Sequence, residues 1–183
     1  MRDSNQSGKG ISLKERVIIE VKSLYEAFNR EKVKEAVEYL VREGVDAEEE
    51  KRELYRIRFR ELLQKRIKVN WAGMLLGPFW LSYRNRPVGA LYMSLLSYLI
   101  QVLLAQVAIK TVASHPLITV ISLILLILVA LAPYLYAGFL GDAYLAVSLY
   151  KGLSIRKNLL AFLLYLLSGF ILFSVLDALF PLT

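Results

Sequence analysis

Apolar residues recur every three or four positions through the first 70 residues, a spacing that is typical of amphipathic helices and not of strands. The apolar positions are Leu13, Val17, Val21, Leu24 and Phe28, then Val33, Val37, Leu40 and Val41, then Tyr55, Phe59, Leu62 and Leu63. The pattern therefore predicts three helices, each with one apolar face directed at a core.

Residues that cap helices lie at the expected ends of these three helices. Ser12-Leu-Lys-Glu15 is a capping box, in which the Ser hydroxyl and the Glu carboxylate each accept an N–H at a helix start. Asn29 can cap the second helix, and Gly44 suits the position just after its end. Asp46-Ala-Glu-Glu49 repeats the capping pattern for a third helix, expected to reach about Lys68.

Four long apolar runs follow, at residues 71–83, 87–109, 117–139 and 159–176. A helix of 23 residues is about 34 Å long and one of 18 residues about 27 Å, enough for a hydrocarbon core of about 30 Å. The run at 71–83 would reach only about 20 Å and contains two glycines and a proline. We therefore predict three transmembrane helices at 87–109, 117–139 and 159–176, with 71–83 interfacial or re-entrant.

The apolar character continues past the second of these runs. As one helix, Leu117–Tyr150 would be about 51 Å long, well beyond the core. We expect a kink near Pro133, with the end of the helix emerging into the cytoplasm after Gly141-Asp142.

Charge divides the chain in the same place as hydropathy. Residues 1–70 contain 17 of the 23 Lys and Arg and 14 of the 16 Asp and Glu. The remaining 113 residues are too poor in charge to cover a water-soluble globule. The chain is thus predicted to be an all-α integral membrane protein. We expect a disordered start at 1–11, a cytoplasmic helical domain at 12–69 and a membrane domain at 70–183.

The distribution of basic residues predicts the orientation. If 71–83 does not cross the bilayer, Arg84, Arg86, Lys151, Arg156 and Lys157 share one side with the N-terminal region, and only Lys110 lies on the other. Basic loops face the cytoplasm. We expect a multi-pass protein of the plasma membrane with a cytoplasmic N-terminus and the C-terminus outside.

The segment 70–84, NWAGMLLGPFWLSYR, contains the pattern N-W-A-x-x-x-x-G-P-F-W-x-x-Y-R. It resembles the signature of a family of small uncharacterised prokaryotic membrane proteins, domain of unknown function twenty-six twenty-eight. The resemblance covers roughly residues 68–160 and implies a cytoplasmic segment followed by membrane helices, without a known reaction. Asp142-Ala143-Tyr144 stands where the family has an Asn shortly before a Tyr. Motif and interface candidates are Asn70, Trp71, Gly77, Pro78, Phe79, Trp80, Tyr83, Arg84, Arg86, Asp142 and Tyr144.

Elementary chemistry gives this motif a structural role. Gly73-x-x-x-Gly77 permits close helix contact, and Pro78 suits the first turn of a helix. Trp80 and Tyr83 are expected at the headgroups, with Arg84 on a phosphate or a carboxylate. A niche for a lipid headgroup is the functional alternative. We further expect Asp142 to contact Arg84, or as second choice Arg86.

Chemistry typical of enzymes is missing from the sequence. The chain has no Cys and a single His, and it contains no phosphate-binding loop, nucleophile elbow or zinc-protease motif. We expect no enzyme activity, no metal and no cofactor.

The leading hypothesis is a non-enzymatic scaffold or adaptor whose residues 12–68 meet a protein partner. A subunit of a small oligomeric transporter or channel is the alternative, and a lipid-binding protein of the membrane surface is the third possibility. Homo-oligomers are compatible with each, and nucleic acid is not expected as a partner, because acidic residues are interleaved with the basic ones. Anionic headgroups are expected near Arg56, Arg60, Lys65, Arg66, Lys68, Arg84 and Arg86.

Overall fold

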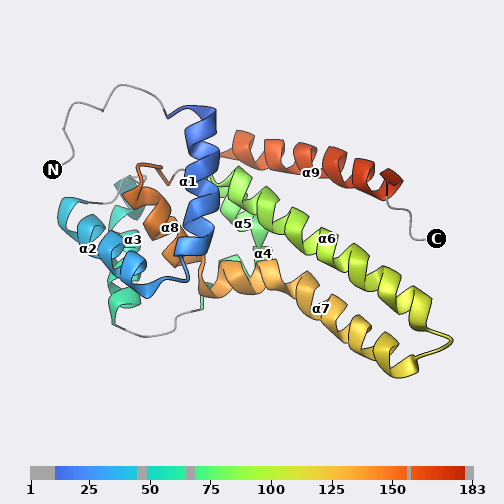
Figure 1. The fold of residues 1–183 in the computed structure, drawn as a ribbon. Coiled ribbons are helices and arrows are strands. Elements are labelled where there is room, and N and C mark those ends of the chain that lie inside the picture. Colours follow the sequence, from blue (N-terminus) through green and yellow to red (C-terminus); the bar gives the residue numbers. More distant parts are fainter. Residues whose placement is uncertain (1–10, 45–48, 65–68, 156–157, 180–183) are drawn as a thin grey trace.

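A computed structural model describes residues 11–44, 49–64, 69–155 and 158–179, which are α-helical and contain no strand. The expected disordered start lies outside the described residues, apart from Ile11. The helices are α1 (Leu13–Glu26), α2 (Arg30–Glu43), α3 (Glu49–Leu63), α4 (Trp71–Leu76), α5 (Pro78–Tyr83), α6 (Pro87–Thr111), α7 (Pro116–Phe139), α8 (Gly141–Tyr150) and α9 (Leu159–Leu179) (Figure 1).

The predicted capping residues set the ends of α1 and α2. The Ser12 hydroxyl accepts from the Glu15 amide, and the Ser12 amide donates to the Glu15 carboxylate at 2.9 Å. The side-chain oxygen of Asn29 accepts from two amides in the first turn of α2. Gly44 ends α2 with a φ of 99°, which a side chain would oppose. The expected cap at Asp46 and the expected helix end near Lys68 lie outside the described residues.

Among the residues that the structure describes, three helices are long and apolar enough to cross a membrane, as predicted. They are α6, α7 and residues 159–176 of α9, with mean hydropathy of 1.8, 2.7 and 2.6. In an 18-residue apolar stretch of each helix, only 22%, 17% and 17% is buried within the protein, so the apolar surface is available to lipid. In Figure 1 the three helices extend from one end of the molecule, with α6 between α7 and α9.

Polar side chains join the membrane helices. The Ser97 hydroxyl donates to the Val129 carbonyl at 2.8 Å, and Gln101 donates to Ser97, which ties α6 to α7. Ser94 on α6 and Tyr165 on α9 share a hydrogen bond of 2.9 Å. Ser97 and Tyr165 therefore take the helix-joining role that polar side chains have in membranes, while Gln101 bonds within its own helix.

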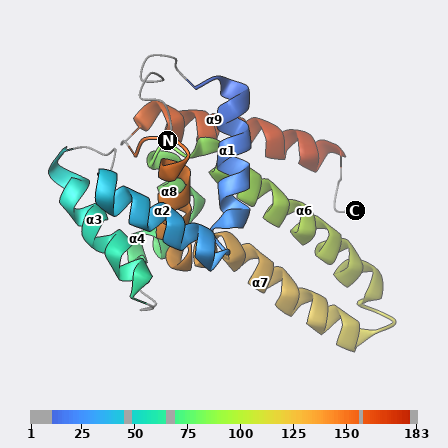
Figure 2. The ribbon, with the colours of Figure 1, turned by 60° about the vertical axis from the view of Figure 1, so that its left-hand side comes forward.

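At the other end of the molecule, α1, α2 and α3 pack around α8, and we call these four helices the head (Figure 2). Val37 of α2 and Phe59 of α3 are fully buried in one core with Tyr144 and Leu145 of α8. That core also contains Leu81 of α5. The regions on the two sides of residue 69 therefore share one core, and the predicted boundary there does not separate two independently packed units.

The helix α8 corrects one expectation. A kink was expected near Pro133, but the second membrane helix continues through Pro133 and ends at Phe139. After Leu140 a separate helix, α8, begins at Gly141. Leu145 and Ala146 are both fully buried, so α8 is covered on several sides and lacks the one-sided pattern that would have revealed it. At about 15 Å, α8 is too short to cross the membrane.

The apolar stripe predicted for α1 meets the core only partly. Leu24 is buried in the core as expected, but Leu13 and Phe28 are 75% and 68% exposed. The buried side of α1 carries Glu20 and Ser23 beside Leu24, which the pattern did not predict. The stripes predicted for α2 and α3 are confirmed, because their members are buried or packed against the core.

Candidate functional site

The motif segment, residues 70–84, folds into the two short helices α4 and α5. The side-chain oxygen of Asn70 caps α4 by accepting from the Gly73 amide at 3.0 Å. The backbone N–H of Asn70 donates to the Gly138 carbonyl at 2.8 Å. Pro78 occupies the first turn of α5, where no N–H is needed. The motif thus begins by attaching its first residue to the end of α7.

The two motif glycines allow α4 to lie directly against α7. A Cβ atom at Gly73 would overlap the backbone carbonyl of Ala137. A Cβ atom at Gly77 would come within 2.6 Å of the Tyr134 ring, and Gly77 also has a φ of 52°. The close contact predicted for the small-residue pattern is confirmed.

The motif aromatics divide into buried and exposed members. Trp80 is buried and packs against Gly141 at the start of α8, so its predicted place among the headgroups is wrong. Phe79 and Tyr83 stack against Phe162 of α9. Trp71 is 66% exposed, which keeps it available as an interfacial residue.

Arg84 ends the motif with its guanidinium over two rings. The guanidinium carbon lies 5.6 Å from the centre of the Tyr55 ring and 5.8 Å from that of Trp80. A cation over an aromatic face is stabilised by about 0.5–2 kcal/mol, depending on desolvation. Arg84 therefore joins α3 to α5, rather than reaching a phosphate or carboxylate as predicted.

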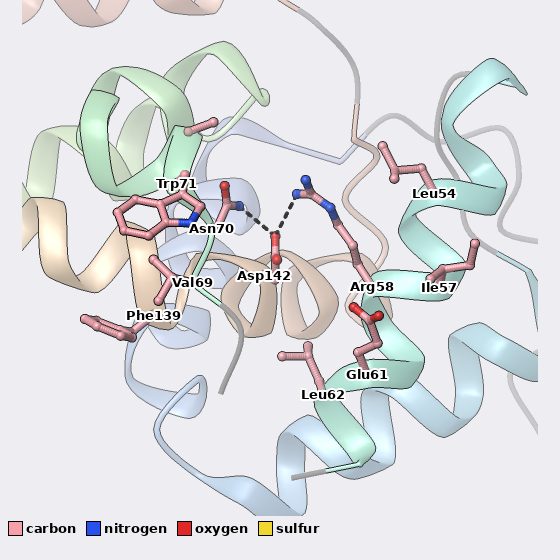
Figure 3. A pocket seen from close by; sticks show the side chains of 11 residues that line it. Leu54, Ile57, Arg58, Glu61, Leu62, Val69, Asn70, Trp71, Phe139 and Asp142 are labelled. Atoms are coloured by element: carbon pink, nitrogen blue, oxygen red, sulfur yellow. Dashed lines mark hydrogen bonds and ion pairs between the residues drawn. The ribbon is translucent and has the colours of Figure 1, made fainter. Parts of the chain in front are cut away.

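Asp142 lies in a cavity of about 340 Å³ between α3, Asn70 and the junction of α7 with α8 (Figure 3). Asn70 donates to its carboxylate at 3.0 Å, and an Arg58 nitrogen lies 3.7 Å from the same oxygen. Arg58 thus takes the direct ion pair that was expected for Arg84 or Arg86, while the charge of Arg84 is near enough to lower the pKa of this carboxyl. Arg58 replaces them because α3 folds back over this junction, a contact between residues far apart in sequence.

Burial raises the pKa of the Asp142 carboxyl above its ordinary value of 3.8, although Arg58 and the bond from Asn70 act against this. The folded chain therefore binds this proton more tightly than the unfolded chain. The stabilising contribution is complete below pH 3.8 and is lost as the pH rises through the folded-state pKa.

We expect Asp142→Asn to remove this dependence, because an amide does not titrate and its oxygen can still accept from Asn70. Thermal midpoints of both proteins in detergent should show the wild type losing stability relative to the variant as the pH rises. A difference that stays constant with pH would contradict the assignment.

Arg86 is fully buried where α5, α6 and α8 meet. It donates to the Ser148 hydroxyl at 2.9 Å, to the Ser154 carbonyl at 2.9 Å and to the Asn85 carbonyl at 3.0 Å. Burial lowers the pKa of this guanidinium. Arg86 cannot serve as the predicted contact for lipid headgroups, because none of its surface is accessible.

Glu20 brings a buried carboxylate to the same junction. It accepts from the Gly89 amide in the first turn of α6 at 2.8 Å and from Arg16 at 3.0 Å. Arg16 also donates to the Asn85 carbonyl and side chain, each at 2.7 Å. We call Arg16, Glu20, Asn85 and Arg86 the junction network. A carboxylate at a helix N-terminus is favoured by the helix dipole.

Tyr144 is fully buried beside this network, with its hydroxyl against Gly89. Burial raises the pKa of this hydroxyl well above its ordinary value of 10.0. Tyr144 and Arg86 are among the residues predicted from the sequence, whereas Arg16, Glu20 and Asn85 are not. One signal was present, because Glu20 interrupts the apolar run Ile18-Ile19-Glu20-Val21.

The candidate residues thus gather on two sides of α8. Asn70 and Asp142 meet at its start, next to Trp80 and Arg84, while Arg86 and Tyr144 lie at the junction network. The basic residues Arg56 and Arg60 are exposed on α3, and Lys65, Arg66 and Lys68 lie outside the described residues. No cluster of possible metal ligands occurs within the described ranges.

The sequence model of the family described as Protein of unknown function (DUF2628) matches residues 42–141. The match begins earlier than the region of resemblance and takes in α3, from which Tyr55 reaches Arg84 of the motif and Arg58 reaches Asp142. No curated protein and no solved structure matches the chain.

Proposed function

The chain belongs to the DUF2628 family of proteins of unknown function, and from that starting point we propose that it is a non-enzymatic membrane scaffold. Its three membrane helices hold the head at the cytoplasmic face of the plasma membrane. The head presents α2 to a protein partner. The C-terminus then lies outside.

The outward surface of α2 is the observation that supports this proposal. Lys34, Glu38, Tyr39 and Arg42 line an open recess of about 550 Å³ together with Tyr150 of α8. Tyr39 and Tyr150 stack edge to face with ring centres 5.2 Å apart. Tyrosine is enriched at protein-binding surfaces, because its rigid ring supplies contact area at low entropic cost, and the rims of such surfaces are polar.

The inner side of α2 makes this surface rigid. Val37 and Leu40 are buried against the core, and the Tyr150 hydroxyl donates to Glu35 at 2.8 Å. A partner would therefore meet a preformed surface and would not have to order it on binding, which lowers the entropic cost of association.

A photo-crosslinking amino acid at Tyr39, in the full-length protein in native membranes, tests the proposal. We expect one discrete adduct, which is lost or reduced about 30-fold when Glu38→Lys and Arg42→Glu are added, as for a contact worth about 2 kcal/mol. The same amino acid at Ser114 serves as the control, because that residue lies at the opposite end of the molecule. Equal adducts from Tyr39 and Ser114, or none from Tyr39, would refute the scaffold proposal.

A transporter or channel subunit is the competing proposal. It requires several copies around an axis, because Gln101 bonds to Ser97 and Ser97 bonds to the Val129 carbonyl of α7 instead of lining a path. A monomer by mass measurement in detergent and in native membranes would speak against it.

The orientation gives a separate prediction. The chain has no Cys, so single substitutions can be labelled cleanly. Lys34→Cys on α2 should react with a membrane-impermeant maleimide only when the cytoplasmic face is open. Ser114→Cys, between α6 and α7, should react only from outside. Both side chains are exposed, so the labelling reports the side of the membrane and not burial. Labelling of both positions from one side would contradict three crossings.

A further inference from the structure

The surface of α1 is divided into three sectors. Glu20, Ser23 and Leu24 are buried against the rest of the protein. On one flank of this buried sector lie five apolar side chains, none of them buried, which we call the apolar sector: Val17, Ile18, Val21, Tyr25 and Phe28. On the other flank lie Glu15, Lys22 and Glu26. A soluble helix packed on a core needs one apolar face, so the apolar sector requires a second explanation.

Contacts fix the direction in which the apolar sector points. Tyr25 meets Tyr92 of α6 edge to face, with ring centres 6.2 Å apart and their hydroxyls hydrogen-bonded. Phe28 meets Tyr136 of α7, with ring centres 5.6 Å apart. Both partners belong to membrane helices. Tyr92 and Tyr136 are partly buried against the core, so the apolar sector extends from the edge of that core over the ends of α6 and α7.

The depth of these contacts is that of the membrane interface. Tyr92 lies five residues inside the start of α6, about 8 Å along its axis, and Tyr136 lies three residues, about 5 Å, before the end of α7. Helices that lie in the plane of a membrane bury their apolar face about 5–10 Å into the boundary between headgroups and acyl chains. Figures 1 and 2 both show α1 running across the inner ends of α6 and α9 rather than along them.

From these observations we propose that α1 lies in the plane of the membrane, with its apolar sector inserted among the lipids at the level of Tyr92 and Tyr136. The occupant of this surface is the bilayer that the three membrane helices span. This membrane-binding surface is separate from the α2 recess and does not depend on a protein partner.

The opposite flank of α1 fits this placement. Glu26 forms an ion pair with Lys151 at the end of α8, on the side of α1 that faces α8. Lys14 lies at the N-terminal end of the apolar sector, where a long aliphatic stem lets its ammonium group reach the headgroups. In this placement the charged side chains of α1 face α8 and water, and its apolar side chains face the lipid.

A matched pair of cysteine variants tests the proposal. Val17→Cys lies in the apolar sector, and Lys22→Cys lies about 140° away around the helix on the polar flank. Both side chains are exposed, so neither change disturbs the core. Each full-length variant is labelled with bimane and reconstituted into phosphatidylcholine and phosphatidylglycerol vesicles. Leu123→Cys in α7 and Ser114→Cys provide the lipid and water references.

We expect a nitroxide on the upper acyl chain to quench bimane at Val17 at least twofold more than at Lys22, and aqueous iodide to show the reverse order. Iodide quenching of Val17 equal to that of Lys22 would overturn the proposal, because the sector would then face water. Protection of Val17 from both quenchers would also overturn it, because another protein surface would then cover the sector. Thermal midpoints equal to that of the wild type establish that both variants are folded.

Discussion

Glu20→Ala is expected to lower the free energy of unfolding by about 3–5 kcal/mol, because it removes one partner of a buried charged network. Arg16 and the Gly89 amide would both lose their acceptor, and the buried charge of Arg86 would lose a nearby carboxylate. For a chain of this size the loss corresponds to a fall in the thermal midpoint on the order of 10 °C. Thermal unfolding of the full-length protein in detergent measures it.

A surface glutamate provides the matched control for this substitution. Glu38 pairs with Lys34 at 3.7 Å on an exposed face of α2, so Glu38→Ala should cost no more than about 0.5 kcal/mol. Glu20→Gln should fall between the two, because its oxygen can still accept from Gly89 but carries no charge. If Glu20→Ala and Glu38→Ala shift the midpoint equally, the junction network does not stabilise the fold.

Gly73→Val is expected to cost about 3 kcal/mol, at the upper end of the range for overpacked sites. The new side chain would collide with the Ala137 carbonyl, which belongs to the α7 backbone and cannot rotate away. Separating α4 from α7 would also disturb the hydrogen bonds that Asn70 makes to Gly138 and Asp142. In a Trp71→Phe background, Trp80 is the one remaining tryptophan, and its emission should shift to the red as it becomes exposed.

Gly169 in α9 gives the comparison for a glycine without such a contact. A Cβ there meets only the Phe173 ring, at an ordinary 3.7 Å. Gly169→Ala should be neutral or stabilising by up to about 1 kcal/mol, since alanine is the better helix former. Equal losses for Gly73→Val and Gly169→Ala would show that close packing of α4 on α7 is not required.

The sequence predicts local features of this fold well and long-range contacts poorly. Ser12, Asn29 and Gly44 mark helix ends because capping depends on a few adjacent residues. The three membrane helices were predictable because length and hydropathy suffice. By contrast, α8 was hidden because a helix buried on several sides has no amphipathic pattern.

The misassigned face of α1 has a different origin. Its periodicity is genuine, but the pattern records only that apolar residues avoid water, and not whether a protein core or a lipid layer covers them. The partner of Asp142 was missed for a third reason. The choice between Arg58 and Arg84 depends on how α3 folds back, and neither residue's local sequence contains that information.

The burial of Arg86 has a consequence for how the chain is made. Ser148, which accepts its bond, follows 62 residues later. At about 5–20 residues per second, about 3–12 s pass between the synthesis of the two. During that interval the guanidinium has no Ser148 hydroxyl to bond. The burial of Arg86 therefore has to wait until α8 has been made, so the start of α6 reaches its final packing only after a later part of the chain is present.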